Sequence, residues 1–122
     1  MSKTILSVDD SPSVLQMVKL SLSGGGYRVE LANGGAEAIN RVRTGGIDMV
    51  LTDLNMPGMD GITLIRALRK LPQATGLPIV FVTTESAAAM KQEAKAAGAT
   101  GWITKPFRPD ELLAVVRKVL GA

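Results

Sequence analysis

Short apolar runs alternate along this chain with longer segments whose apolar residues recur at helical spacing. The runs predict strands at residues 4–8, 27–31, 47–52, 78–82 and 100–104. The third and fourth runs are almost entirely apolar, which is typical of parallel strands that are covered on both faces. Strand and helix alternate five times, so we expect an α/β fold of the (βα)5 type with a doubly wound parallel sheet.

Capping residues indicate where the helices begin. Ser11 precedes Pro12 at the start of the first helix, and Pro109 starts the last one. We expect Asn33 to cap the second helix and Ser86 to cap the fourth.

The expected fourth helix, at 87–97, is rich in alanine and contains Met90 as its one large apolar residue. Gly98 should close it. Alanine favours the helical conformation but buries little area, so we expect this helix to be weakly anchored, as moving elements usually are. Taken by itself, the segment is more typical of a plain surface helix.

The length and composition suit one ordinary domain. We expect residues 1–122 to form a single domain without an output domain. The sequence contains no cysteine and no histidine, which excludes disulfides, thiolate or imidazole metal ligands and a cysteine nucleophile. No signal peptide or spanning segment is visible, so we expect a cytoplasmic protein.

The formal net charge of +3 is unevenly spread. Residues 1–60 carry five Lys/Arg and seven Asp/Glu, whereas residues 61–122 carry nine and four. A basic half is one mark of nucleic-acid contact. Here the basic residues stand singly or in pairs, without a basic arm or interleaved aromatics, so solvated helix faces explain them better. We expect neither nucleic acid nor membrane as a partner.

Polar residues follow four of the predicted strands at the points where those strands end. Asp9 and Asp10 follow the first strand, Asp53 the third, Thr83 the fourth and Lys105 the fifth. The carboxyl ends of parallel strands share one edge of the sheet, where such folds bind ligands. The sequence therefore predicts one site with three carboxylates, a hydroxyl and an ammonium.

The charges of this predicted site indicate its chemistry. Two carboxylates 4 Å apart repel by about 4 kcal/mol at an effective dielectric of about 20, so three of them need a cation besides Lys105. Oxygen ligands in an open site favour Mg²⁺, which keeps several waters. Asp53 is then the natural nucleophile for in-line phosphoryl transfer. The cation and Lys105 would neutralise the phosphoryl oxygens, and Thr83 would donate a hydrogen bond to one of them.

Each signal is weak alone, because an Asp-Asp pair or a Lys-Pro pair after a strand is commonly part of a turn. Together they make the chain similar, over nearly its whole length, to the receiver domains of bacterial two-component response regulators. The motifs that carry the resemblance are Val8-Asp9-Asp10-Ser11, the segment from Leu51 to Gly61, Val82-Thr83-Thr84-Glu85 and Lys105-Pro106-Phe107. The chain resembles the stand-alone, CheY-like chemotaxis receivers most, which implies a flavodoxin-like sandwich with strand order 2-1-3-4-5.

The resemblance implies a role for each site residue. Asp53 would accept phosphate from a histidine kinase, and Thr83 and Lys105 would contact the phosphoryl group. The Lys105–Pro106 bond would be cis, although X–Pro statistics alone favour trans. Four residues would hold Mg²⁺, for which Mn²⁺ can substitute: the carboxylates of Asp10 and Asp53, the backbone carbonyl of Asn55 and, through water, Asp9.

Four further positions are expected to govern switching. Trp102 stands where the family places a switch aromatic that is usually Tyr or Phe, and its larger ring argues against a simple toggle and for partial exposure. Thr84 stands where a small residue is common, so its bulk should restrict access to the phosphoryl group. Asn55 and Glu85 occupy positions that tune hydrolysis, and both look chemotaxis-like.

The resemblance implies a signalling switch rather than an enzyme in the ordinary sense, with self-catalysed phosphotransfer and autodephosphorylation. The expected partners are a CheA-like histidine kinase, a target such as a flagellar motor switch component, and a phosphatase. The target would bind the face formed by the fourth helix, fifth strand and fifth helix.

Two alternatives remain open. A Mg²⁺-dependent phosphatase with an aspartyl-phosphate intermediate usually has a second acid where this chain has Asn55. An interaction module that is never phosphorylated would usually lack an acid, Thr83 or Lys105.

Overall fold

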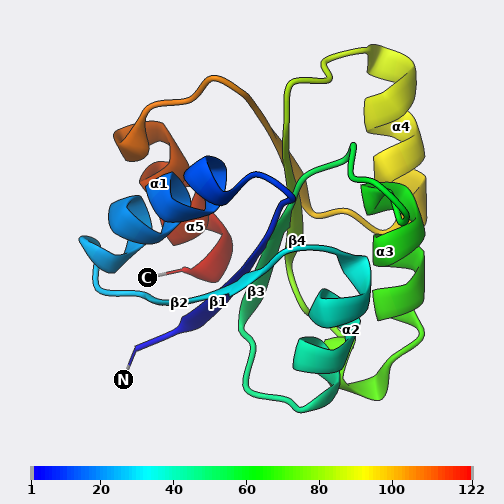
Figure 1. Ribbon diagram of the computed structural model, residues 1–122, viewed down its shortest axis with the longest axis horizontal. Helices are drawn as coiled ribbons and strands as arrows, with labels where there is room; N and C mark the ends of the chain where they lie inside the picture. Colours follow the sequence, from blue (N-terminus) through cyan, green and yellow to red (C-terminus); the bar gives the residue numbers. More distant parts are fainter. Residues whose placement is uncertain (1, 122) are drawn as a thin grey trace.

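Residues 2–121, which the computed structural model describes, form one sheet of five strands flanked by helices (Figure 1). The sheet order is β2-β1-β3-β4-β5, and every neighbouring pair of these strands is parallel. The predicted (βα)5 fold and strand order are confirmed, and the predicted strand bounds differ by at most two residues. The strands are β1 (Thr4–Val8), β2 (Arg28–Ala32), β3 (Met49–Thr52), β4 (Ile79–Thr83) and β5 (Gly101–Thr104).

Helices cover both faces of the sheet (Figure 1). One face carries α1 (Pro12–Ser23) and α5 (Pro109–Leu120). The other carries α2 (Gly35–Arg43), α3 (Gly61–Arg69) and α4 (Ala88–Ala97), with a short 3-10 helix, η1 (Pro72–Ala74), before β4. Every residue of β3 and β4 is buried, as their apolar runs predict for strands between two layers. Within residues 2–121, no helix combines the length and apolarity needed to cross a membrane.

The start of α1 agrees with the sequence prediction, whereas the start of α2 does not. The Ser11 hydroxyl accepts a hydrogen bond from the Val14 N–H at 3.4 Å. The predicted Asn33 cap of α2 is wrong, because the N-cap residue is Gly34. Glu37, in the first turn, instead turns its carboxylate back and accepts the Asn33 N–H at 2.8 Å. A carboxylate at this end also complements the helix dipole.

The start of α4 is likewise set by a glutamate and not by the predicted serine. Ala87 is the N-cap residue, so the predicted Ser86 cap is wrong. The Glu85 carboxylate accepts the N–H groups of both Ser86 and Ala87, at 3.1 and 3.0 Å. The C-terminal prediction is correct, because Gly98 closes the helix with φ +112°, a conformation that glycine adopts without steric cost.

Side chains of α4 bury little, as the alanine-rich sequence predicts. Among the residues that the structure describes in this helix, Ala94 alone is buried, while Met90 is half-buried. Arg69, near the C-terminal end of α3, donates from Nε and Nη2 to the Gly98 carbonyl, at 3.2 and 2.8 Å. Its Nη1 donates to the Ala74 carbonyl at 3.0 Å. The guanidinium therefore ties the end of α4 to α3 and η1.

Candidate functional site

The C-terminal ends of the central strands bring the predicted site residues together. The Asp53 N–H donates to the Val8 carbonyl at 2.9 Å, which places the end of β3 beside the end of β1. The Lys105 N–H donates to the Thr83 carbonyl at 2.8 Å, which joins the ends of β4 and β5 in the same way. Parallel pairing thus collects residues from four strands at one edge, as the sequence predicts.

Three carboxylates form an acidic cluster at this edge. Asp9, Asp10 and Asp53 each offer a carboxylate oxygen, and these oxygens all lie within 4.8 Å of one another. Asp9 and Asp53 are nearly buried, at 3% and 9% exposure, whereas Asp10 is exposed. A group of oxygen donors at this spacing suits a hard divalent cation such as Mg²⁺, and the exposed side of the cluster leaves room for its waters.

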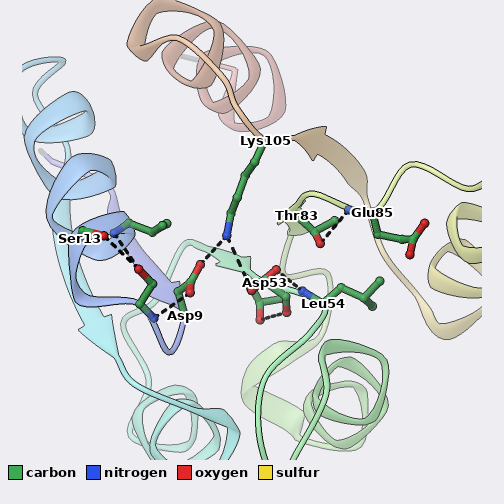
Figure 2. Close-up of polar contacts among 10 residues, drawn as sticks. Asp9, Ser13, Asp53, Leu54, Thr83, Glu85 and Lys105 are labelled. Carbon is green, nitrogen blue, oxygen red and sulfur yellow. Dashed lines mark hydrogen bonds and ion pairs between the residues drawn. The ribbon is translucent and has the colours of Figure 1, made fainter.

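Lys105 compensates part of this negative charge. Its Nζ lies 2.8 Å from Asp9 Oδ2 and 3.7 Å from Asp53 Oδ2. Figure 2 shows the lysine side chain extending between these two carboxylates. The Lys105–Pro106 peptide bond is cis, as the family resemblance implies.

Asp9 uses both of its carboxylate oxygens within the protein. Oδ1 accepts the Ser11 N–H at 3.0 Å and Oδ2 accepts Lys105 Nζ at 2.8 Å. Direct metal coordination by Asp9 would compete with these bonds.

Asp53 is held in place by the backbone that follows it. Its Oδ1 accepts the Leu54 N–H at 2.8 Å. Burial raises the pKa of the Asp53 carboxyl above its ordinary value, and the charge of Asp9 acts in the same direction. The Lys105 ammonium opposes this rise but does not cancel it. The free site therefore disfavours a charged Asp53 and gains from a bound cation.

The β4–α4 segment lies beside this cluster, but its glutamate points elsewhere. Thr83 is fully buried, and its Oγ1 accepts the Glu85 N–H at 3.3 Å. Figure 2 shows the Glu85 side chain beyond Thr83, away from Lys105, where it caps α4. Thr84 and Asn55 are exposed.

Trp102 is tied to this same segment. Its Nε1–H donates to the Glu85 carbonyl at 3.0 Å, and the side chain is half-buried, in agreement with the partial exposure expected for a ring of this size. The ring also lies 5.6 Å from the Phe81 ring, centroid to centroid, and 5.9 Å from Lys91 Nζ. Neither Phe81 nor Lys91 stands out in the sequence, because one is an ordinary strand residue and the other an ordinary helix-surface lysine.

Comparisons with known proteins agree with this fold and site. The sequence profile of the response regulator receiver domain matches residues 5–117. The DNA-binding response regulator MtrA of Mycolicibacterium smegmatis is 38% identical over 117 residues, which cover 96% of this chain and 50% of that protein. The chain therefore spans about half the length of the curated relatives it matches.

Solved structures are similar over the whole domain. Chemotaxis protein CheY4 of Vibrio cholerae is 42% identical with a TM-score of 0.95, covering 98% of this chain and 100% of that one. The receiver domain of a sensor histidine kinase from Pseudomonas aeruginosa, whose structure has a magnesium ion coordinated in the active-site cleft, is 26% identical. Its TM-score is 0.91, and the match covers 100% of both chains.

The chain belongs to the response regulator receiver domain family and is thus a receiver domain of two-component signalling. Receiver domains bind Mg²⁺ at an acidic site, and the cluster of Asp9, Asp10 and Asp53 has the donor atoms for it.

Proposed function

We propose that this domain is a phosphorylation-dependent signalling switch whose phosphoacceptor is Asp53. A carboxylate oxygen of Asp53 attacks the phosphorus of a phosphohistidine on a histidine kinase. A P–O bond forms, the P–N bond breaks, and the imidazole nitrogen keeps the electron pair of the broken bond. The observation that supports this best is the convergence of three carboxylates and Lys105 at the carboxyl edge of the sheet.

The oxygen donors of the site fit a divalent cation, either Mg²⁺ or Mn²⁺. The carboxylates of Asp10 and Asp53 and the backbone carbonyl of Asn55 would hold it directly. Asp9 would act through water, because its two carboxylate oxygens already accept hydrogen bonds from Ser11 and Lys105. When bound, the cation neutralises negative charge on the carboxylates and on the incoming phosphoryl oxygens.

Lys105 and Thr83 act on the phosphoryl group in this proposal. The Lys105 ammonium, 3.7 Å from Asp53 Oδ2, can shift from Asp9 towards a phosphoryl oxygen. The Thr83 hydroxyl can donate a hydrogen bond to another phosphoryl oxygen. Its Oγ1 accepts the Glu85 N–H, and hydrogen bonding by the hydroxyl partly offsets the burial that raises the pKa of the Asp53 carboxyl, so it faces the phosphorylation site. Thr84 stands exposed beside the site, where its bulk would restrict access to the phosphoryl group. The exposed Asn55 and, on the β4–α4 segment, Glu85 would tune the rate of autodephosphorylation.

We infer that α4, β5 and α5 form the output surface and that chemotaxis is the pathway. A cavity of about 230 Å³ opens on this surface between α4 and β5, and Lys91, Lys95 and Trp102 contribute to its lining. The similarity to the chemotaxis protein CheY4 supports a chemotaxis role. A cytoplasmic location is part of the same proposal. The partners would be a CheA-like kinase, a flagellar motor switch component and a phosphatase.

A second candidate is control of transcription. It is favoured by the relation to MtrA, which is a DNA-binding response regulator. The chemistry at Asp53 would be the same in both cases, and the two candidates differ in what the output surface binds.

Phosphorylation can be tested with the protein alone, Mg²⁺ and phosphoramidate, a small donor with a P–N bond. Intact mass should show one added phosphoryl group per chain. It should show none in Asp53→Asn, and none when EDTA removes the Mg²⁺. Many donor equivalents hydrolysed per chain would indicate a phosphatase instead, and no label at all would indicate an interaction module.

The ligand assignment has its own test. Titration of Mg²⁺ into Asp9→Asn and Asp10→Asn should show the larger loss of affinity in Asp10→Asn. Equal losses in the two variants would contradict the assignment of Asp9 to a water-mediated role.

A further inference from the structure

Phe81 lies at the centre of the sheet, one layer below the candidate phosphorylation site. It is completely buried, and in the sheet it stands directly between Thr52 of β3 and Trp102 of β5. Residues that are paired in adjacent parallel strands point to the same face, so these three side chains form a row across the sheet on the α3–α4 side. The polar chemistry of the site does not involve Phe81.

One end of this row contacts the backbone of Asp53. The Thr52 hydroxyl donates to the Asp53 carbonyl at 3.0 Å. Gly61, the first residue of α3, packs against both that carbonyl and the edge of the Phe81 ring, and a Cβ at this position would overlap with both. The Gly61 N–H also donates to the Leu54 carbonyl at 2.7 Å. A change in the backbone that carries Asp53 can therefore reach the Phe81 ring through Gly61.

The other end of the row contacts the output surface. The Phe81 and Trp102 rings are tilted by 50° with centroids 5.6 Å apart, within the distance at which aromatic pairs attract each other. Trp102 in turn donates a hydrogen bond to the Glu85 carbonyl, and its ring lies beside Lys91 of α4. Because tight packing transmits displacement, a shift of one ring is expected to change the position of the other.

We propose that Phe81 is a positioning residue that couples the Asp53 segment to Trp102 through the core. This coupling works in parallel with the one through the Thr83 hydroxyl and the Glu85 backbone. The inference rests on the proposed phosphorylation of Asp53. Phe81 does not touch the phosphoryl group, so it should change the response to phosphorylation and not the chemistry itself.

Replacement of Phe81 by Leu tests the coupling, because leucine stays apolar but loses the ring edge that meets Gly61 and Trp102. Ile79→Val is the matched control, since Ile79 is also completely buried, on the same strand and facing the same core. Thr83→Ala removes the parallel route, and the double variant with Phe81→Leu removes both. Because Thr83 is also proposed to contact the phosphoryl group, these two variants are compared with the wild type at saturating mimic. Phe81→Met serves if Phe81→Leu does not fold.

The probe is beryllofluoride with Mg²⁺, which mimics the phosphoryl group, added to ¹⁵N-labelled protein. One readout is the mimic-induced shift of the Trp102 indole N–H resonance and of the Lys91 amide. A second is the mimic affinity, taken from the titration. We expect Phe81→Leu to lose at least half of the induced shift with less than a twofold change in affinity. Ile79→Val should retain the shift, and the double variant should lose it entirely.

The outcomes separate the two hypotheses. If the mimic binds and Phe81→Leu retains the wild-type shift, or if Ile79→Val loses as much, the coupling role is wrong and the proposed function stands. If the mimic does not bind the wild type, the proposed function fails and the coupling fails with it.

Discussion

The helices α3 and α4 are neighbours on the same face of the sheet, yet they are anchored in opposite ways (Figure 1). The α3 helix is held along its length by apolar side chains that point into the core, namely Ile62, Leu64, Ile65 and Leu68. In α4, within the part of the chain that the structure describes, Ala94 is the single buried residue. Side-chain burial therefore stabilises α3 far more than α4.

Polar contacts at the ends replace this burial in α4. Arg69 of α3 donates to the Gly98 carbonyl at the C-terminal end, and Trp102 donates to the Glu85 carbonyl ahead of the N-terminal end. A helix that is held in this way can shift without opening the core. We infer that α3 serves as a fixed support and that α4 is the helix able to shift in response to changes at the site.

The largest effect should come from emptying the core beneath α3. Ile65→Ala removes a completely buried side chain and should lower the free energy of unfolding by about 2–5 kcal/mol. Met90 of α4 is half-buried, so Met90→Ala should lower the free energy of unfolding by less than about 1 kcal/mol. Urea unfolding monitored by circular dichroism measures both. An equal loss in the two variants would show that side-chain burial anchors α4 after all.

Removal of the Arg69 guanidinium should have an intermediate effect. Arg69→Met keeps the apolar stem but deletes three hydrogen bonds to the carbonyls of Gly98 and Ala74, which should cost about 1–3 kcal/mol. Hydrogen exchange should accelerate in the last turn of α4 more than in α3. Arg66→Met is the control, because Arg66 is exposed on the same helix and should be near neutral. Unchanged exchange in Arg69→Met would rule out this anchor.

The smallest effect should come from the charge of Asp53. Burial raises the pKa of this carboxyl in the folded protein, so the folded state binds its proton more tightly than the unfolded state does. Asp53→Asn should therefore stabilise the Mg²⁺-free protein at neutral pH. A gain of about 1 kcal/mol would raise Tm by about 3–5 °C.

The pH dependence provides a sharper form of this prediction. The extra stability of Asp53→Asn over the wild type should be fully present above the raised pKa that the Asp53 carboxyl has in the folded protein. It should disappear as pH falls through that value towards the ordinary carboxyl pKa, because the wild type then becomes neutral as well. Thermal unfolding across this pH range, without Mg²⁺, measures it. Hydrogen exchange should slow at β3 and at the start of α3 in Asp53→Asn, and should stay unchanged in α4. If Asp53→Asn remained more stable than the wild type at low pH, the charge explanation would be wrong.

Local sequence signals predicted the starts of α1 and α5 correctly, but not the caps of α2 and α4. Ser11 caps α1 as expected. Asn33 and Ser86 do not cap, because α2 and α4 begin one residue later, with Gly34 and Ala87 as their N-cap residues. The Glu37 and Glu85 carboxylates accept N–H groups at and just ahead of these helix starts, with charge-assisted hydrogen bonds.

The pattern of strands and helices was enough to predict the fold, the residues that converge at one edge of the sheet, and the low burial of α4. Asp9, Asp53 and Lys105 had to meet because each follows a parallel strand, and all such strands end at one edge. The alanine-rich α4 had little to bury in any arrangement.

The residues that connect the site to its surroundings could not be predicted from the sequence and became visible in the folded structure. The hydrogen bond from Arg69 to the Gly98 carbonyl joins positions 29 residues apart. Phe81 contacts Gly61 and Trp102 because α3 and β5 pack beside it. Such contacts depend on where whole elements settle against one another. That position is set by the summed packing of both cores, and no local pattern of residues specifies it.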